Sequence, residues 1–245
     1  MLEKIPRKHS IQSTLYQVST ANALVEGIYE GAVRVDTLRK HGDMGLGTFE
    51  NLDGEMVILD GHFFQIRGDG SVTEAKDDAL SPFAVVTHFK SDVTVDLPIC
   101  PDLSRLFVQF DRLRHTDNFF FALRVDGTFD YVQTRVMCRT EEGVPLVKAA
   151  AVQPEFEFHN IPGTLVGFWT PQYAKNLNVP GYHLHFLSKD HTSGGHLLQC
   201  SSSSHQLRLQ IQREGNYRIA FPENKDFVSA DLRKDSSNDL ERAES

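Results

Sequence analysis

Short apolar runs separated by Asp-Gly pairs constrain the fold of this chain more than any other feature. The runs at residues 45–51, 55–59, 63–67 and 72–75 are separated by Asp53-Gly54, Asp60-Gly61 and Asp69-Gly70. Asp-Gly pairs supply the positive φ angles of tight hairpin turns, and runs of this length suit strands rather than helices. The pattern predicts a meander of antiparallel hairpins in the first third of the chain.

The remaining segments extend this β-rich pattern. Further strands are predicted at 14–18, 83–89, 119–125, 131–137, 163–170, 181–187, 196–202, 205–212 and 217–221, with Asp126-Gly127 expected to turn the chain between 125 and 131. Helical periodicity marks residues 20–29, 102–113, 145–152 and 171–177, and Ser19 or Thr20 is a suitable cap for the first helix. The polar end, residues 234–245, is expected to be a solvated tail or a short helix.

A polar stretch at residues 139–143 interrupts the strand pattern and suggests a domain boundary. We therefore expect an α/β (α+β), β-rich protein of two domains, residues 1–143 and residues 144–245. Both domains are expected to have mixed, largely antiparallel sheets with helices at their margins. The second is expected to carry a metal site on a β-hairpin.

Composition narrows the class of protein. The chain has 245 residues, 40% hydrophobic composition and a formal net charge of -8, which allows a substantial core and argues against a nucleic-acid partner. The N-terminus lacks an apolar signal segment, and no stretch approaches about 18 uninterrupted apolar residues, so we expect a soluble, cytoplasmic protein without membrane contact. Cys100, Cys138 and Cys200 are widely spaced, and we interpret them as reduced packing residues.

Three histidines have the spacing of a metal site. His183 and His185 flank Leu184, and His196 follows Ser193-Gly194-Gly195. Alternate side chains share one face of a strand, and ten intervening residues allow the chain to return beside it, so one hairpin can gather all three imidazoles. Three nitrogen ligands without a thiolate leave a coordination position open, as in a catalytic zinc site.

Other interpretations of these histidines stay open from the spacing alone. A His-x-His strand can simply present a half-exposed polar face. His159, His191 and His205 are further imidazoles, and His191 competes with His196 for the third place. We prefer His196 because it restarts a strand, whereas His191 lies near a loop tip.

Few charged residues lie at positions where a β-rich protein would direct a catalytic side chain into a site. Glu55 follows a turn at the mouth of an apolar strand, which by itself predicts an exposed strand-end carboxylate. Arg135 shares a predicted strand face with Gln133 and is either solvated or a guanidinium fork for a substrate carboxylate. Glu241 and Glu244 would ordinarily be regarded as tail charges.

Several segments together resemble the α-acetolactate decarboxylase family. They are residues 16–20 (YQVST), 45–49 (GLGTF), 52–55 (LDGE), 132–135 (VQTR), 163–168 (GTLVGF), 181–186 (GYHLHF) and 193–196 (SGGH). Their order and spacing are more specific than any single segment. The resemblance runs from about residue 14 to the C-terminus.

The resemblance implies a two-domain α/β homodimer whose N-terminal sheets meet at the interface. It implies zinc bound by His183, His185 and His196, and functional roles for Glu55, Arg135 and a tail carboxylate, which is Glu244 or the nearby Glu241. The implied substrate is the small molecule 2-acetolactate, decarboxylated to acetoin through a metal-stabilised enediolate that is protonated on one face.

Three rival functions use the same residues. One is a hydrolase that would use zinc-bound hydroxide, although chelation of the substrate oxygens would leave little room for that nucleophile. A cupin-like oxygenase or isomerase also builds its site from His-x-His on a strand, but it would need Asp190 as a carboxylate ligand because no glutamate closely follows His185. A non-catalytic module would use the imidazoles to capture a ligand or to stabilise the hairpin.

Overall fold

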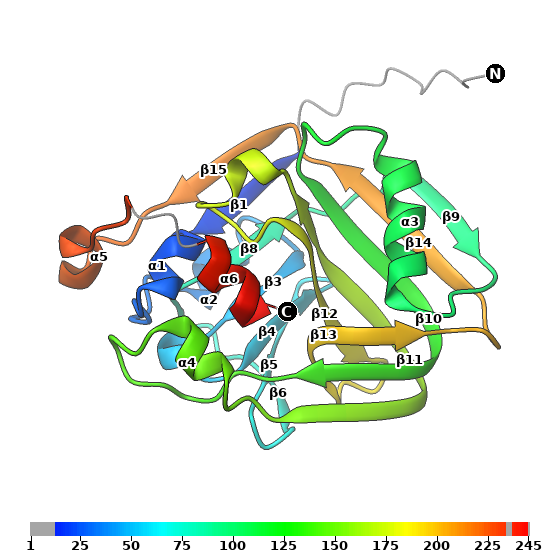
Figure 1. Cartoon of the computed structure of the whole chain (residues 1–245), viewed down its shortest axis with the longest axis horizontal. Helices are drawn as coiled ribbons and strands as arrows, with labels where there is room; N and C mark the ends of the chain where they lie inside the picture. Colours follow the sequence, from blue (N-terminus) through cyan, green and yellow to red (C-terminus); the bar gives the residue numbers. More distant parts are fainter. Residues whose placement is uncertain (1–12, 234–236, 245) are drawn as a thin grey trace.

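A mixed sheet holds the N-terminal strands in the computed structural model, which describes residues 13–233 and 237–244 (Figure 1). Within residues 13–233 its order is β15-β1-β8-β3-β4-β5-β6. The bounds are β1 Thr14–Val18, β3 Met44–Thr48, β4 Glu55–Leu59, β5 His62–Ile66, β6 Val72–Glu74, β8 Ala84–Thr87 and β15 Asn216–Ala220. The predicted meander is confirmed, since β3 to β6 pair successively and antiparallel.

A second, antiparallel sheet curls on itself. Its order is β11-β12-β13-β10-β14-β9, and β11 also pairs with β10, so β10 to β13 close a ring. The bounds are β9 Val93–Leu97, β10 Phe121–Arg135, β11 Glu155–Thr170, β12 Gly181–Ser188, β13 Gly194–Ser201 and β14 Leu207–Arg213. Helix α3 (Leu103–Arg114) covers the outer side and packs against β13 and β14.

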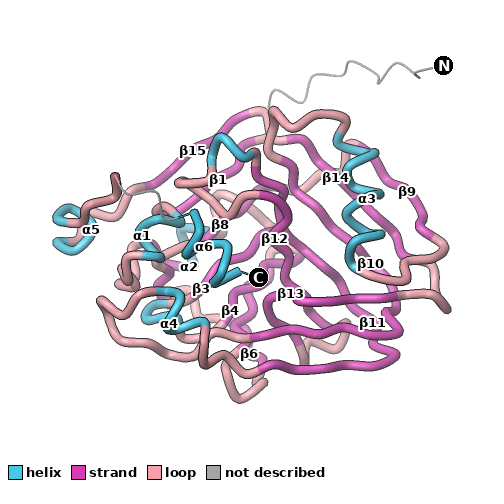
Figure 2. Tube along the Cα trace, in the orientation of Figure 1, coloured by secondary structure: helices cyan, strands magenta, loops and turns pink. Residues whose placement is uncertain are grey.

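The short helices lie at the margins of the sheets (Figure 2). They are α1 Ala21–Val25, α2 Val35–Leu38, α4 Leu146–Ala150, α5 Lys225–Ser229 and α6 Ser237–Glu244, with 3-10 turns at Glu50–Leu52 and Gln172–Ala174 and a small pair of strands, β2 Val33–Arg34 and β7 Leu80–Ser81. Thr20 caps α1 by accepting from the N–H of Ala23 at 3.2 Å. Among the described residues no helix combines the length and apolarity needed to cross a bilayer.

Side chains alternate between the two faces of each strand, and this divides the core into separate layers. One apolar cluster lies between the two sheets and includes Val57 and Leu59 of β4, Val166 of β11 and Leu187 of β12. A second fills the curled sheet beneath α3, and a third lies on the other face of the first sheet. Side chains that point into the layer between the sheets can therefore meet although they come from distant parts of the chain.

Two details differ from the sequence-based expectations. The turn predicted at Asp126-Gly127 is wrong, because β10 is one strand that continues through both residues. Asp126 pairs with Thr164 on one side and Arg208 on the other, and its carboxylate accepts from Arg124, Thr164 and Gln210. A turn there would break the ladder on both sides.

The predicted boundary at residue 143 does not coincide with the division between the sheets. Strands β9 and β10 precede it but belong to the second sheet, whereas β15 follows it and pairs in parallel with β1 of the first. The β-rich fold with largely antiparallel sheets and marginal helices is confirmed. The division into two independent domains stays a prediction.

Candidate metal centre

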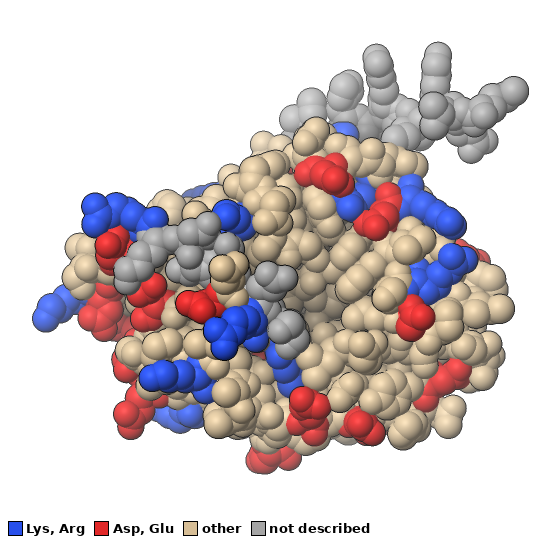
Figure 3. Space-filling model, in the orientation of Figure 1, with Lys and Arg blue, Asp and Glu red and all other residues tan. Residues whose placement is uncertain are grey.

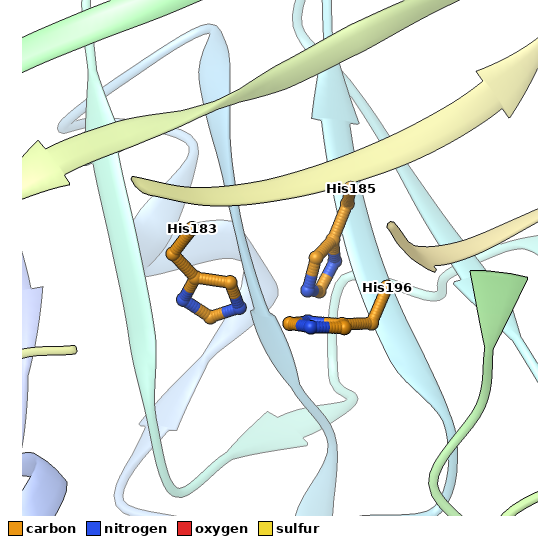
Figure 4. A group of neighbouring side chains, drawn as sticks. All are labelled: His183, His185 and His196. Carbon is orange, nitrogen blue, oxygen red and sulfur yellow. The ribbon is translucent and has the colours of Figure 1, made fainter. Parts of the chain in front are cut away.

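Three imidazoles from one hairpin point toward one another in the layer between the sheets (Figure 4). His183 and His185 lie on β12, and His196 lies on β13 directly opposite His185. One ring nitrogen from each residue lies within 4.8 Å of the others, and all three side chains are buried. The structure thus brings together the three histidines that the spacing selected, in an arrangement that could hold a metal ion.

Strand β12 is fixed from both faces. On the face away from the histidines, the Tyr182 ring stacks on Phe107 of α3 at 4.2 Å between centroids. On the inner side, Nδ1 of His185 lies 2.9 Å from the carbonyl oxygen of Met56 on β4. That oxygen can only accept, so Nδ1 carries the proton and Nε2 keeps its lone pair. This hydrogen bond fixes the orientation of the His185 ring and leaves Nε2 available to bind a metal ion.

Burial keeps His183 and His185 neutral. It lowers the pKa of His183 to about 3, with the Arg135 charge adding to the effect, and it lowers the pKa of His185 well below the ordinary value. Metal ions bind neutral imidazole, so no proton has to be displaced near neutral pH. Imidazole nitrogens are suitable ligands for several first-row metal ions, among them zinc, copper, iron and nickel.

Glu55 reaches the same centre from the first sheet. It shares its face of β4 with Val57 and Leu59, which pack between the sheets, and it is only 6% exposed. Its Oε1 accepts from the N–H of Met137 at 3.0 Å, and its Oε2 lies 3.6 Å from Nε2 of His185. The exposed strand-end interpretation is therefore wrong, because this end of β4 is covered by the second sheet.

Arg135 ends β10 and is buried beside His196. Its Nη2 donates to the carbonyl oxygen of Ala243 at 2.5 Å and lies 3.5 Å from Nε2 of His196. Alternation predicted a face shared with Gln133, but Gln133 donates to Glu155 at the surface. The pairing of β10 with β13 shifts register between Gln133 and Thr134, and such a bulge re-aims the side chains that follow it.

The chain end contributes a helix to the site. Leu240 and Ala243 of α6 are 1% and 4% exposed and line the same cavity as the histidines. The expected short helix is confirmed. Glu244 is the last residue of α6, and its side chain, like that of Glu241, lies outside the described residues.

Most of the cavity wall is apolar and could not be assigned from the sequence. Beside Glu55, Arg135 and the histidines, it is lined by Ala21, Leu24, Gly47, Thr48, Leu52, Phe83, Met137, Leu146, Gln153, Val179, Leu240 and Ala243. These residues come from several elements, and an ordinary apolar position carries no sign of what it will face. Leu240 is the partial exception, since an isolated leucine in a polar tail indicates a docking residue.

The competing residues are engaged elsewhere. His191 lies in the turn between β12 and β13, with its ring 4.5 Å from that of Phe64. His159 packs beside Tyr131 on the far part of β11, and His205 lies in an exposed loop. Asp190, the carboxylate that a cupin-like site would need, accepts from the hydroxyls of Ser188 and Thr192 and so stabilises the turn.

Comparison with known proteins identifies relatives of this chain. The family model described as alpha-acetolactate decarboxylase matches residues 15–234. An alpha-acetolactate decarboxylase from Methanosarcina mazei is 41% identical, over 96% of this chain and 82% of that protein, and one from Bacillus licheniformis is 38% identical, over 94% and 91%. The crystal structure of alpha-acetolactate decarboxylase from Bacillus subtilis strain 168 matches with a TM-score of 0.90 and 36% identity, over 94% of this chain and 99% of that one.

Proposed function

Because this chain belongs to the alpha-acetolactate decarboxylase family, and is therefore a carboxy-lyase acting on a small molecule, we propose that it works as a zinc enzyme. In this proposal His183, His185 and His196 hold the metal, while Glu55, Arg135 and Glu244 act on 2-acetolactate. The observation that carries it is the convergence of three buried imidazoles with a carboxylate and a guanidinium around one cavity.

The three imidazole ligands are suitable for zinc and for its use as a Lewis acid. Three imidazole nitrogens from one rigid hairpin leave a position open toward the cavity. A zinc ion held by His183, His185 and His196 would supply Lewis acidity to the oxygen atoms of 2-acetolactate. The hydrogen bond from His185 to Met56 holds one ligand in place before any metal binds, so little reorganisation is needed.

Arg135 is suited to hold the substrate carboxylate. Its guanidinium carries a permanent charge in a buried position, and its bond to Ala243 fixes the direction of the fork. Tight binding of the carboxylate alone would stabilise the ground state, so we assign Arg135 mainly an orienting role, with the scissile bond turned out of the carbonyl plane. When that bond breaks, carbon dioxide leaves and the electron pair of the bond stays on the former α-carbon. The neighbouring ketone delocalises this pair, which gives an enediolate.

A positioned acid must then return a proton to that carbon. Glu55 is anchored through Oε1 to the Met137 N–H, which leaves Oε2 directed toward the histidines. Delivery from one fixed side would yield a single enantiomer of acetoin. Glu55 and Glu244 are both candidates for this donor. The mechanism requires only that one of them be protonated when carbon dioxide leaves.

The test is product formation as a function of bound metal. Carbon dioxide and acetoin are measured from 2-acetolactate with the purified protein, after removal of metal by a chelator, and after addition of zinc or, as a control, magnesium. We expect activity to disappear on chelation and to return with zinc only. Full activity in metal-free protein would overturn the zinc proposal, and a folded, zinc-loaded protein that forms no acetoin would overturn the mechanism.

Two wider expectations accompany this proposal. The homodimer implied by the family resemblance and the cytoplasmic location suggested by composition stay predictions. Size-exclusion chromatography with light scattering tests the first, and fractionation of the source cells tests the second.

A further inference from the structure

Helix α6 forms one wall of the catalytic cavity with two apolar side chains. Leu240 and Ala243 lie one helical turn apart and so share a face of the helix. Both belong to the core between the sheets, and both line the cavity that contains the histidines. On the face of the molecule seen in Figure 3, mostly uncharged atoms surround the hollow beside α6.

This wall is held at a fixed place relative to the charged groups of the site. The Ala243 carbonyl accepts from Nη2 of Arg135, which ties the end of α6 to the guanidinium. Helices α1 and α4 also pack against α6, and Leu24 and Leu146 of these helices line the same cavity. Leu240 is 1% exposed between them. The apolar surface next to Arg135 is therefore part of the ordered site.

Substrate chemistry indicates what this surface meets. The carbon that loses carbon dioxide carries a carboxylate, a hydroxyl, an acetyl group and an alkyl group. In the proposed arrangement Arg135 holds the carboxylate, and the metal bound by the histidines holds the hydroxyl and ketone oxygens. The alkyl group is then the substituent of that carbon without a polar partner. Because it is attached to the same carbon as the carboxylate, it lies close to Arg135 and hence to α6.

The cavity is also small. Its volume is about 50 Å³, which is room for about three to five water molecules. A molecule as large as 2-acetolactate fills such a space, so an additional methylene must be accommodated by movement of the wall. Protein interiors resist such movement.

We propose that Leu240 is a specificity-determining residue that sets the size of the alkyl group accepted on the reacting carbon. It admits the methyl group of 2-acetolactate and restricts the ethyl group of 2-ethyl-2-hydroxy-3-oxobutanoate. This inference rests on the proposed role of Arg135 in binding the carboxylate. It does not depend on which metal the histidines bind.

The test compares the two substrates in Leu240→Ala and Leu240→Phe. We expect the ratio of kcat/KM for the ethyl over the methyl substrate to rise about 10-fold or more in Leu240→Ala, since one methylene in an apolar pocket changes specificity by about 10- to 200-fold. The larger ring of Leu240→Phe should lower the ratio below that of the wild type. Both substrates are assayed on one preparation carrying the same metal, so the ratio is independent of metal loading.

Leu240 also anchors α6, and a control separates that role from specificity. Val25 lies on α1 in the same core but does not line the cavity, so Val25→Ala should slow both substrates alike and leave the ratio unchanged. If Leu240→Ala slows both substrates equally, Leu240 is only an anchor and the proposal is overturned. If the zinc requirement fails while the ratio still shifts, the proposed function is corrected and this inference stands.

Discussion

A methyl group added at Gly167 should damage the metal centre from outside the cavity. Gly167 lies on β11 opposite Leu184, beside the strand segment that carries His183 and His185. A Cβ atom at this position would lie 2.0 Å from the backbone oxygen of His183 and 2.9 Å from its carbonyl carbon. The obstructing atoms are backbone, so no side-chain rotation relieves the clash.

The size of the effect follows from that distance. Cβ atoms essentially never lie within 3.0 Å of such a neighbour, so β11 and β12 must part by at least about 1 Å at His183. Metal sites tolerate only about 0.2 Å in their ligand distances. Overpacking of this kind costs about 1–3 kcal/mol of folding free energy. A ligand misplaced by about 1 Å should lower turnover by about 10²-fold.

The assay for Gly167→Ala combines denaturant unfolding, zinc affinity by competition with a chromophoric chelator, and kcat at saturating zinc. The control is Gly127→Ala in β10, whose Cβ would first meet the tip of the Leu207 side chain at 2.5 Å. A side-chain tip can move, so this variant should keep zinc affinity and turnover. If Gly167→Ala binds zinc within twofold of the wild type and retains full turnover, the packing argument for β12 is wrong.

Three further outcomes are expected. Burial raises the pKa of Glu214 to about 7 from 4.5, so the folded state binds this proton more tightly and stability present below pH 4.5 is lost as pH rises through 7. The loss in unfolding free energy amounts to about 3 kcal/mol. Unfolding free energies measured across this pH range should show that Glu214→Gln removes this part of the pH dependence. The same pH dependence in the variant as in the wild type would contradict the prediction. Arg135→Lys keeps the charge but loses the planar fork, so kcat/KM should fall about 10²-fold with unchanged far-UV circular dichroism, and wild-type kinetics would exclude the orienting role. Deletion of residues 240–245 removes the α6 wall and Glu244, so turnover should collapse while the sheet signal persists, and full activity would show that the chain end is dispensable.

Local features of the sequence determined the local structure. The Asp-Gly pairs fixed the hairpins from β3 to β6, because a positive φ and alternating apolar residues are properties of a few neighbouring positions. The same locality explains why spacing placed His183, His185 and His196 on one hairpin. It also explains the wrong prediction of a turn at Asp126-Gly127, where hydrogen bonds from β11 and β14 override an intrinsic turn signal.

The tertiary structure decided which of these side chains form a site. Glu55 is buried only because the second sheet covers its end of β4, and Arg135 turns inward only where β10 shifts register against β13. Helix α6 completes the cavity from the far end of the chain through Arg135. Each contact joins segments separated by 60 residues or more, and periodicity within one strand or helix carries no information about its distant neighbours.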